Sequence, residues 1–132
     1  MKNTYINLPI RNVRDTDIFF DQLGFKKNEA FASDDTTNIS INDTSHVMLL
    51  EDARFESFID SRPSMVNTSS IIGIEYGTKD EVDVLFENAI NAGATDTTKP
   101  AENDFMYGKS FQDINGHRWE CFVFTKTKET KK

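Results

Sequence analysis

The sequence has little of what several protein classes depend on. It contains one cysteine, Cys121, so no disulfide can form within the chain. No apolar run approaches the roughly 20 residues that span a bilayer, and the opening MKNTYINLPIRNVRD lacks the apolar stretch of a signal peptide. We therefore expect a cytoplasmic protein with no membrane partner, in which Cys121 acts as a small buried hydrophobic side chain.

Basic side chains are also in the minority. There are 15 of them against 22 acidic ones, which gives a formal net charge of −7. A chain with this charge has no general attraction to phosphate backbones, so nucleic acid is not an expected partner. Basic residues gather only at the end, in KTKETKK, and we interpret residues 127–132 as a solvated charged tail.

The first half of the chain has the pattern of a strand, a helix and three strands. TYINLPI alternates like a strand, Asn12 can cap the helix that follows, and Gly24 can end it. The next strands are expected at about Lys27–Ser33, Thr37–Ile41 and His46–Glu51, separated by the polar turns SDDT and NDTS. The segment from Asp52 to Ser69 connects the halves, and RFESFI within it can form one or two helical turns.

The second half repeats this order. SSIIGIEY is a strand, TKDEVDVLFENAINAGA is a helix that ends at Gly93, and Asn115-Gly116 predicts a hairpin. The strands after the helix are expected at about Thr97–Ala101, Met106–Gln112 and Arg118–Phe124. The 132 residues therefore predict a single α+β domain of two βαβββ modules, at about 1–62 and 67–126.

The closing hairpin carries a more specific resemblance. FMYGKSFQDINGHRWECFVF, Phe105 to Phe124, resembles the last hairpin of the vicinal oxygen chelate superfamily, which includes glyoxalases, bleomycin resistance proteins and dioxygenases. INLPIRNVRDTDIFFDQLGF is similar to the first strand and helix of that superfamily. The resemblance extends over nearly the whole chain and is closest to small bacterial glyoxalase-like proteins described as predicted lactoylglutathione lyases. It implies paired modules whose sheets curl into a cup, and a homodimer.

In the metal-dependent members of this superfamily, four side chains hold a divalent cation, which polarises two oxygens of the substrate. The resemblance places these four positions on Tyr5 or Asn7, on Met48, on Ser70–Ile72 and on Glu120. One carboxylate does not hold a divalent ion tightly, so we expect no cofactor and no metal in the usual place. A divalent metal would need an altered ligand set, in which His46 joins Glu120.

Glu120 is the main candidate for a catalytic or ligand-binding group. Alternation along its strand puts it on one face with Arg118, Phe122 and Phe124, while Trp119, Cys121 and Val123 face the core. The alternative is a salt bridge from Glu120 to Arg118 or Lys109 that only holds the hairpin together. The side chains expected to line a binding cavity are Tyr5, Asn7, Met48, Tyr107, Phe111, Arg118 and Phe122. His117, in the turn, is expected to be a solvated or backbone-bonded side chain.

Two functions from different classes fit these residues. The first is a binding protein of the drug-sequestering type, whose aromatic-lined cup takes a cationic or polar aromatic small molecule without a metal. The second is a metal-dependent enzyme with an altered ligand set, a lactoylglutathione lyase-like protein, an isomerase or a dioxygenase. The metal content of the purified protein would separate the two.

Overall fold

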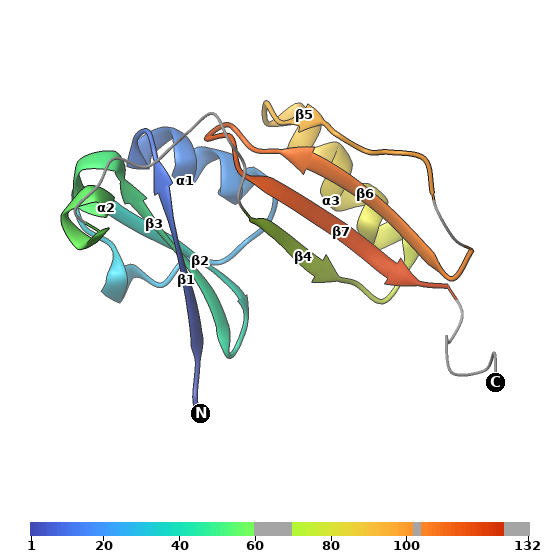
Figure 1. Ribbon diagram of the computed structural model, residues 1–132, viewed down its shortest axis with the longest axis horizontal. Coiled ribbons are helices and arrows are strands. Elements are labelled where there is room, and N and C mark those ends of the chain that lie inside the picture. The colour runs from blue at the N-terminus through green and yellow to red at the C-terminus, as the bar shows by residue number, and fades with distance from the viewer. Residues whose placement is uncertain (60–69, 102–103, 126–132) are drawn as a thin grey trace. The chain divides into compact units, whose positions relative to one another are not determined.

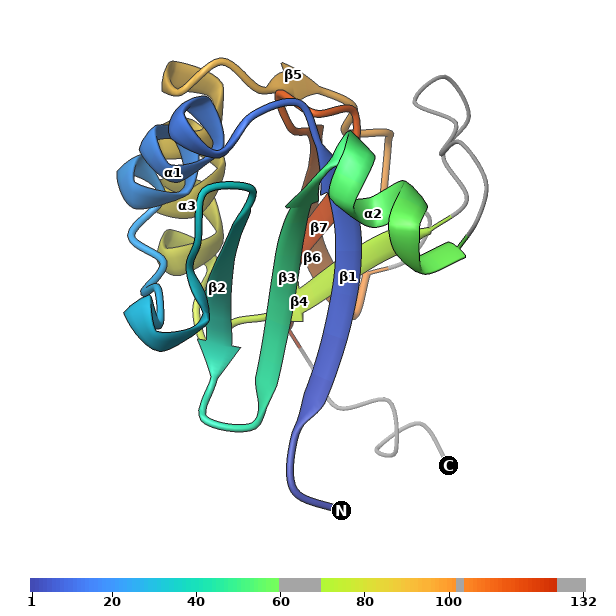
Figure 2. The same cartoon turned by 90° about the vertical axis from the view of Figure 1, so that its left-hand side faces the viewer.

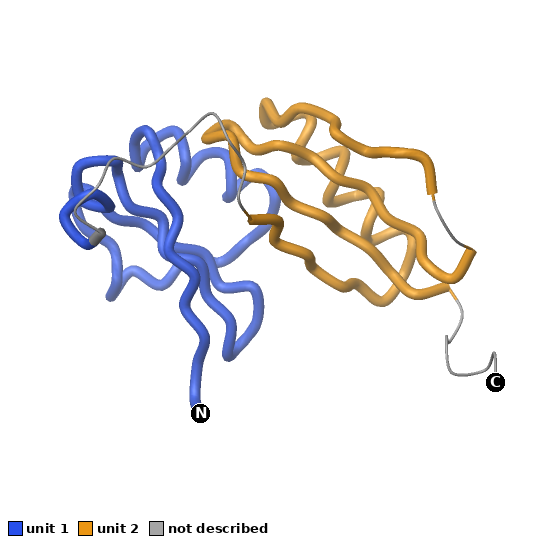
Figure 3. Tube along the Cα trace, in the orientation of Figure 1, with its two compact units in different colours: residues 1–67 blue, residues 68–132 orange. Residues whose placement is uncertain are grey.

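The chain folds as two compact units, residues 1–67 and 68–132, in a computed structural model that describes residues 1–59, 70–101 and 104–125 (Figure 3). Each unit packs a helix against one face of a small sheet (Figure 1). This confirms the α+β class. None of the helices in the described ranges is long and apolar enough to cross a membrane.

The first unit contains a three-stranded sheet. Its elements are β1 (Thr4–Ile10), α1 (Val13–Gln22), the 3₁₀ helix η1 (Glu29–Phe31), β2 (Thr36–Asn42), β3 (Ser45–Glu51) and α2 (Asp52–Ile59). The strand order is β1-β3-β2, with β1 parallel and β2 antiparallel to β3. Helix α1 covers one face of this sheet and buries the side chains of Leu8, Ile10, Phe19, Phe20, Ile39, Val47 and Leu49. Helix α2 packs beside β1 and β3 (Figure 2).

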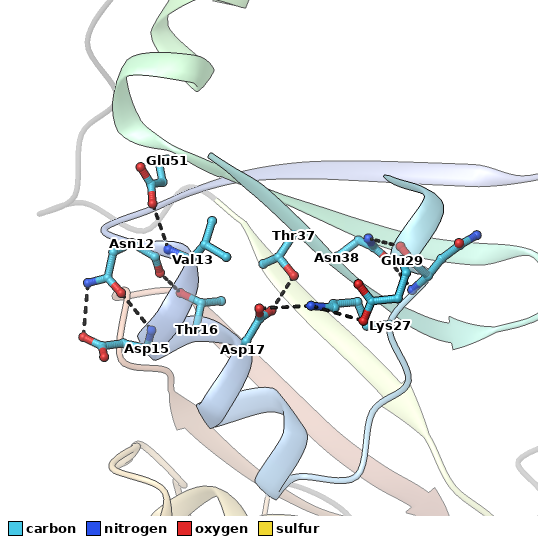
Figure 4. A network of polar contacts seen from close by, with 11 residues as sticks. Asn12, Val13, Asp15, Thr16, Asp17, Lys27, Glu29, Thr37, Asn38 and Glu51 are labelled. Atoms are coloured by element: carbon cyan, nitrogen blue, oxygen red, sulfur yellow. Dashed lines mark hydrogen bonds and ion pairs between the residues drawn. The ribbon is translucent and has the colours of Figure 1, made fainter. Parts of the chain in front are cut away.

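The ends of α1 lie where the sequence predicts them. The Asn12 side chain accepts a hydrogen bond from the backbone N–H of Asp15 at 2.8 Å, and the carboxylate of Glu51 accepts one from Val13 N–H at 2.9 Å (Figure 4). Both bonds satisfy backbone donors that the first helical turn leaves free. After the helix, Gly24 has φ +88°, a left-handed conformation that glycine adopts without strain.

The strand expected at Lys27–Ser33 does not form. Instead Asn28 caps the 3₁₀ turn by accepting from Ala30 N–H, and only Lys26 bridges to the neighbouring strand, at Ser40. The side chain of Asn38, from β2, accepts from Asn28 N–H and donates to Asn28 C=O, both at 2.9 Å (Figure 4). The side chain of Asn38 thereby takes both backbone groups that Asn28 would use in a strand ladder.

The second unit contains a four-stranded sheet. Its elements are β4 (Ile71–Glu75), α3 (Lys79–Asn91), β5 (Thr95–Asp96), β6 (Met106–Gln112) and β7 (Arg118–Phe124). The strand order is β4-β7-β6-β5, and only the β4-β7 pair is parallel. Helix α3 packs on β6 and β7, and the side chains buried in this core include Ile74, Val82, Leu85, Phe86, Ala89, Phe111, Trp119, Cys121 and Val123. The expected core face of β7 is therefore confirmed.

The prediction of a strand at Thr97–Ala101 is also wrong. Thr95 and Asp96 pair with β6, and the last backbone bond runs from Thr97 N–H to Ser110 C=O at 3.1 Å. Side chains then replace the backbone ladder. The Thr98 hydroxyl accepts from Ser110 N–H at 3.0 Å and donates to Ser110 C=O at 3.1 Å, while Asp96 accepts from Thr98 N–H. Pro100 follows and has no N–H with which to resume pairing.

The hairpin between β6 and β7 is confirmed, and the buried carboxylate of Asp113 organises its turn. Asp113 accepts hydrogen bonds from Asn115 N–H at 2.8 Å, His117 N–H at 3.0 Å and the Trp119 indole N–H at 2.8 Å. Gly116 takes φ +93° before the chain turns into β7. His117 is tied to the turn through its backbone, since its C=O also accepts from Asp113 N–H. The turn therefore begins at Asp113, two residues before Asn115-Gly116.

Candidate functional site

The candidate site of the second unit is the sheet face that points away from α3, which we call the far face. Cys121 and Lys109 lie on the α3 side, since the Cys121 thiol is 3.9 Å from the Val82 carbonyl and Lys109 Nζ lies 4.8 Å above the Phe86 ring. Side chains alternate between the two faces of a strand. The residues that strand register places on the far face are Ile71, Gly73 and Glu75 of β4, Arg118, Glu120 and Phe122 of β7, and Met106, Gly108, Ser110 and Gln112 of β6.

Glu120 stands in a row of small residues on this face. Its cross-strand partners are Gly73 on β4 and Ser110 on β6, and its side chain is exposed. It makes no ion pair within 4 Å in the described part of the chain, so the alternative salt bridge to Arg118 or Lys109 is absent, and Lys109 lies on the opposite face. Because the Glu120 carboxylate is exposed and has no ion pair there, it is available to a ligand.

Arg118 is the second charged group of β7 on the far face. It is half-buried between Ile71 and Gln112 in the register of the sheet. Its Nε atom is buried and has no hydrogen-bond partner among the described residues. Leaving a buried donor unsatisfied costs about 1–3 kcal/mol. The guanidinium charge also has no ion-pair partner among the described residues, so it favours an anion supplied from outside.

Phe122 supplies the aromatic surface beside these charges. A side chain on Gly108 would lie 3.2 Å from Phe122 Cβ, and one on Gly73 would lie 3.4 Å from the edge of the Phe122 ring. The two glycines therefore leave the space in which the ring lies across the sheet. Phe124 packs edge-on against Phe122, with ring centroids 5.6 Å apart, and is 50% exposed.

Two of the residues expected to line the cavity lie on the opposite face. The Tyr107 hydroxyl donates to Asp83 of α3 at 2.5 Å, and this bond is the main cause that raises the Tyr107 pKa. Phe111 is 1% exposed and stacks on Trp119 in the core. Tyr107 and Phe111 are odd-numbered like Lys109, so alternation puts them on the α3 side, and placing them with Glu120 was wrong.

Cys121 carries no nucleophilic chemistry. Burial is the main cause that raises the pKa of its thiol to about 11, and its side chain is fully buried. A thiol in this state is almost entirely protonated at neutral pH, whereas the thiolate is the reactive form. The interpretation of Cys121 as a small core hydrophobic side chain is confirmed.

The remaining predicted residues gather on the first unit, on the sheet face that points away from α1. The register pairs Tyr5 with His46 and Asn7 with Met48, so all four share that face. The Tyr5 and His46 rings stack with centroids 5.0 Å apart, and the Ser40 hydroxyl lies 3.2 Å from His46 Nδ1. His46 is half-buried in this cluster.

The donor set does not fit a divalent cation at the superfamily's usual positions. Tyr5 is a stacked phenol, Asn7 a neutral amide and Met48 a thioether. Magnesium and manganese sites favour carboxylates, and iron(II) sites favour carboxylates and imidazoles. No group of three or more His, Cys, Asp or Glu side chains that could hold a metal occurs among the described residues. Glu120 is the one acidic residue at these positions, and it lies in the second unit.

Sequence reasoning missed Gly73, Glu75 and Ser110, which surround Glu120 and Phe122. Their contribution comes from the register between β4, β6 and β7. Register depends on pairing between distant segments, and no local pattern in these residues encodes it. The alternation within β7, in contrast, is a local pattern, and it predicts that Arg118, Glu120 and Phe122 share one face.

Comparison with known proteins identifies the fold. No family model and no curated protein matches the sequence. Among solved structures, a hypothetical protein from S. aureus is similar over 93% of this chain and 94% of its own, with a TM-score of 0.81 and 24% identity. A glyoxalase/bleomycin resistance protein/dioxygenase family enzyme from Burkholderia phytofirmans PsJN is similar over 94% and 99%, with a TM-score of 0.79 and 22% identity.

A glyoxalase-related enzyme from Fulvimarina pelagi is similar over 93% of this chain and 88% of its own, with a TM-score of 0.78 and 15% identity. These likenesses extend over nearly the whole of each chain, as the resemblance of the closing hairpin implies. The chain therefore has the fold of the glyoxalase/bleomycin resistance protein/dioxygenase proteins.

Proposed function

We propose that the chain is a member of this superfamily that binds a small organic molecule on the far face of the second sheet, without a divalent metal in the usual place. The observation that carries the proposal is Glu120, an exposed carboxylate with no ion-pair partner in the described residues, between the small residues Gly73 and Ser110. Fold alone does not select an activity, so the support for this function comes from these side chains.

The chemistry of the face favours a ligand that carries a positive charge and an apolar body. Glu75 lies on the same face as Glu120, so two carboxylates attract a cation there. Phe122 and Phe124 add aromatic faces, which attract cations through their quadrupoles and bury apolar surface. An organic amine with an aromatic ring can bind the carboxylates through its ammonium group and pack its ring against the phenylalanines.

Glu120→Gln tests this proposal, because it removes the charge and keeps the shape. We expect it to weaken binding of benzylamine, measured by calorimetry, by about tenfold, which corresponds to about 1.4 kcal/mol. The melting temperature should change by less than about 3 °C, since the side chain is exposed. Glu87→Gln, on the exposed side of α3, is the matched control and should leave binding unchanged. A lower melting temperature with unchanged affinity would mean that Glu120 is structural.

The metal-dependent alternative makes a different prediction. Protein purified without a histidine tag should contain much less than one divalent ion per chain by elemental analysis, because metal affinity depends on the number and type of ligands. His46→Ala should not change this content. Stoichiometric metal that is lost in both His46→Ala and Glu120→Gln would favour the lyase, isomerase or dioxygenase instead.

The oligomeric state stays a prediction. We propose a homodimer, since closed symmetric pairs are the commonest assemblies and β1 and β4 each pair on one edge only. Sedimentation at micromolar concentration should give about twice the mass of one chain, and a monomer throughout would contradict the prediction.

A further inference from the structure

We infer that the ligand of the far face is a small zwitterion, an aromatic molecule with an ammonium group at one end and a carboxylate at the other. The inference rests on the proposed function and specifies its ligand class. It starts from two opposite charges on β7, those of Arg118 and Glu120, which share the far face and form no ion pair with each other.

The spacing of these two charges suits one ligand that bridges them. Residues two apart on a strand are separated by about 6.6 Å along its axis. The side chains of Arg118 and Glu120 also form no hydrogen bond or ion pair with any other described residue, and the buried Nε of Arg118 is unsatisfied. A ligand with a cation alone would leave the guanidinium charge without a partner and would place a second positive charge near it.

The charges on the far face also fix a direction along the strand. Arg118 lies at the start of β7, and the carboxylates of Glu120 and Glu75 follow toward its end, where Glu75 pairs with Phe122. Lys109 and Asp83 belong to the α3 side. The carboxylate of Asp113 is bonded to its own turn and to the Trp119 indole. The ligand carboxylate is therefore assigned to Arg118 and its ammonium group to the two glutamates.

Apolar surface is available at both ends of this axis. Ile71, which pairs with Arg118, is 60% exposed, and Phe122 and Phe124 lie beyond Glu120. Between them, Gly73 has no side chain and Ser110 a small one. The edge of the Phe122 ring lies over Gly73, so a flat ligand ring would pack against Phe122.

The test uses three probes that differ only in charge: 4-(aminomethyl)benzoate carries both charges, benzylamine the cation and 4-methylbenzoate the anion. We expect calorimetry to show the zwitterion binding at least tenfold more tightly than either singly charged probe. Arg118→Gln should weaken the zwitterion about tenfold yet strengthen benzylamine, because it removes a repelling charge. Arg118→Lys keeps the charge and should retain more affinity for the zwitterion than Arg118→Gln does. Arg54→Gln on α2 is the control and should change nothing.

The outcomes separate this inference from the proposed function. If benzylamine binds as tightly as the zwitterion and Arg118→Gln strengthens both, the ligand is a simple cation; the inference is then overturned and the proposed function stands. If none of the three probes binds and no far-face amide resonance shifts in an NMR titration, the proposed function fails and the inference with it. Tighter zwitterion binding that requires both Arg118 and Glu120 supports both.

Discussion

Replacing Asp113 by alanine is expected to destabilise the second unit by about 3–4 kcal/mol, because three donors lose a charged acceptor. These donors are the backbone N–H groups of Asn115 and His117 and the indole N–H of Trp119. The carboxylate is 5% exposed, so water does not easily replace it. Trp119 is the only tryptophan of the chain, and its fluorescence during urea unfolding therefore reports on this unit.

Two variants test the cause of this loss. Asp113→Asn keeps one acceptor oxygen and should recover part of the stability. Asp43→Ala changes an exposed aspartate in the turn between β2 and β3, and should stay within about 0.5 kcal/mol of the parent. Equal unfolding midpoints for Asp113→Ala and the parent protein would show that the turn does not depend on this carboxylate.

Asn38→Ala is expected to destabilise the first unit by about 2–3 kcal/mol. The side chain is 2% exposed, and it satisfies both the N–H and the C=O of Asn28. Alanine leaves these two backbone groups without partners and opens a cavity beside them. The segment that contains η1 should loosen first, because its remaining backbone bonds to β2 lie at its two ends, from Ser40 N–H to Lys26 C=O and from Ser33 N–H to Thr36 C=O.

Hydrogen exchange provides the measurement. The Asn28 amide should exchange much faster in Asn38→Ala, while the Trp119 indole in the second unit should keep its protection. Asn3→Ala serves as the matched control, since Asn3 is exposed and makes only a 3.5 Å contact with Tyr5. Unchanged protection of Asn28 would contradict the role assigned to Asn38.

Local patterns in the sequence determined much of the fold. The cap at Asn12, the helix ends at Gly24 and Gly93, and the hairpin after Asp113 all depend on residues within a few positions of each other. The alternation of β7 likewise separated Arg118, Glu120 and Phe122 from Trp119 and Cys121. A periodic pattern is enough in these cases because backbone geometry alone fixes where neighbouring side chains point.

The candidate site divides in the same way. The sequence alone predicts Glu120 as a site residue and the face of the strand on which it lies. Its neighbours Gly73 and Ser110 follow only from the register of three strands. The prediction for Tyr107 and Phe111 is wrong because an aromatic residue in a strand near Glu120 lines a cavity only if it lies on the same face of the sheet. Pairing with β7 puts both on the α3 side.

Two expected strands show what the tertiary structure alone decided. At 27–33 the side chain of Asn38 bonds the backbone N–H and C=O of Asn28. At 97–101 the Thr98 hydroxyl bonds the N–H of Ser110 and shares the C=O of Ser110 with Thr97 N–H. Both segments have strand-like sequences, yet a strand exists only if another backbone pairs with it. Local sequence therefore determined the helices, the caps and the faces of β7, while contacts between distant residues decided which extended segments became strands and which side chains surround Glu120.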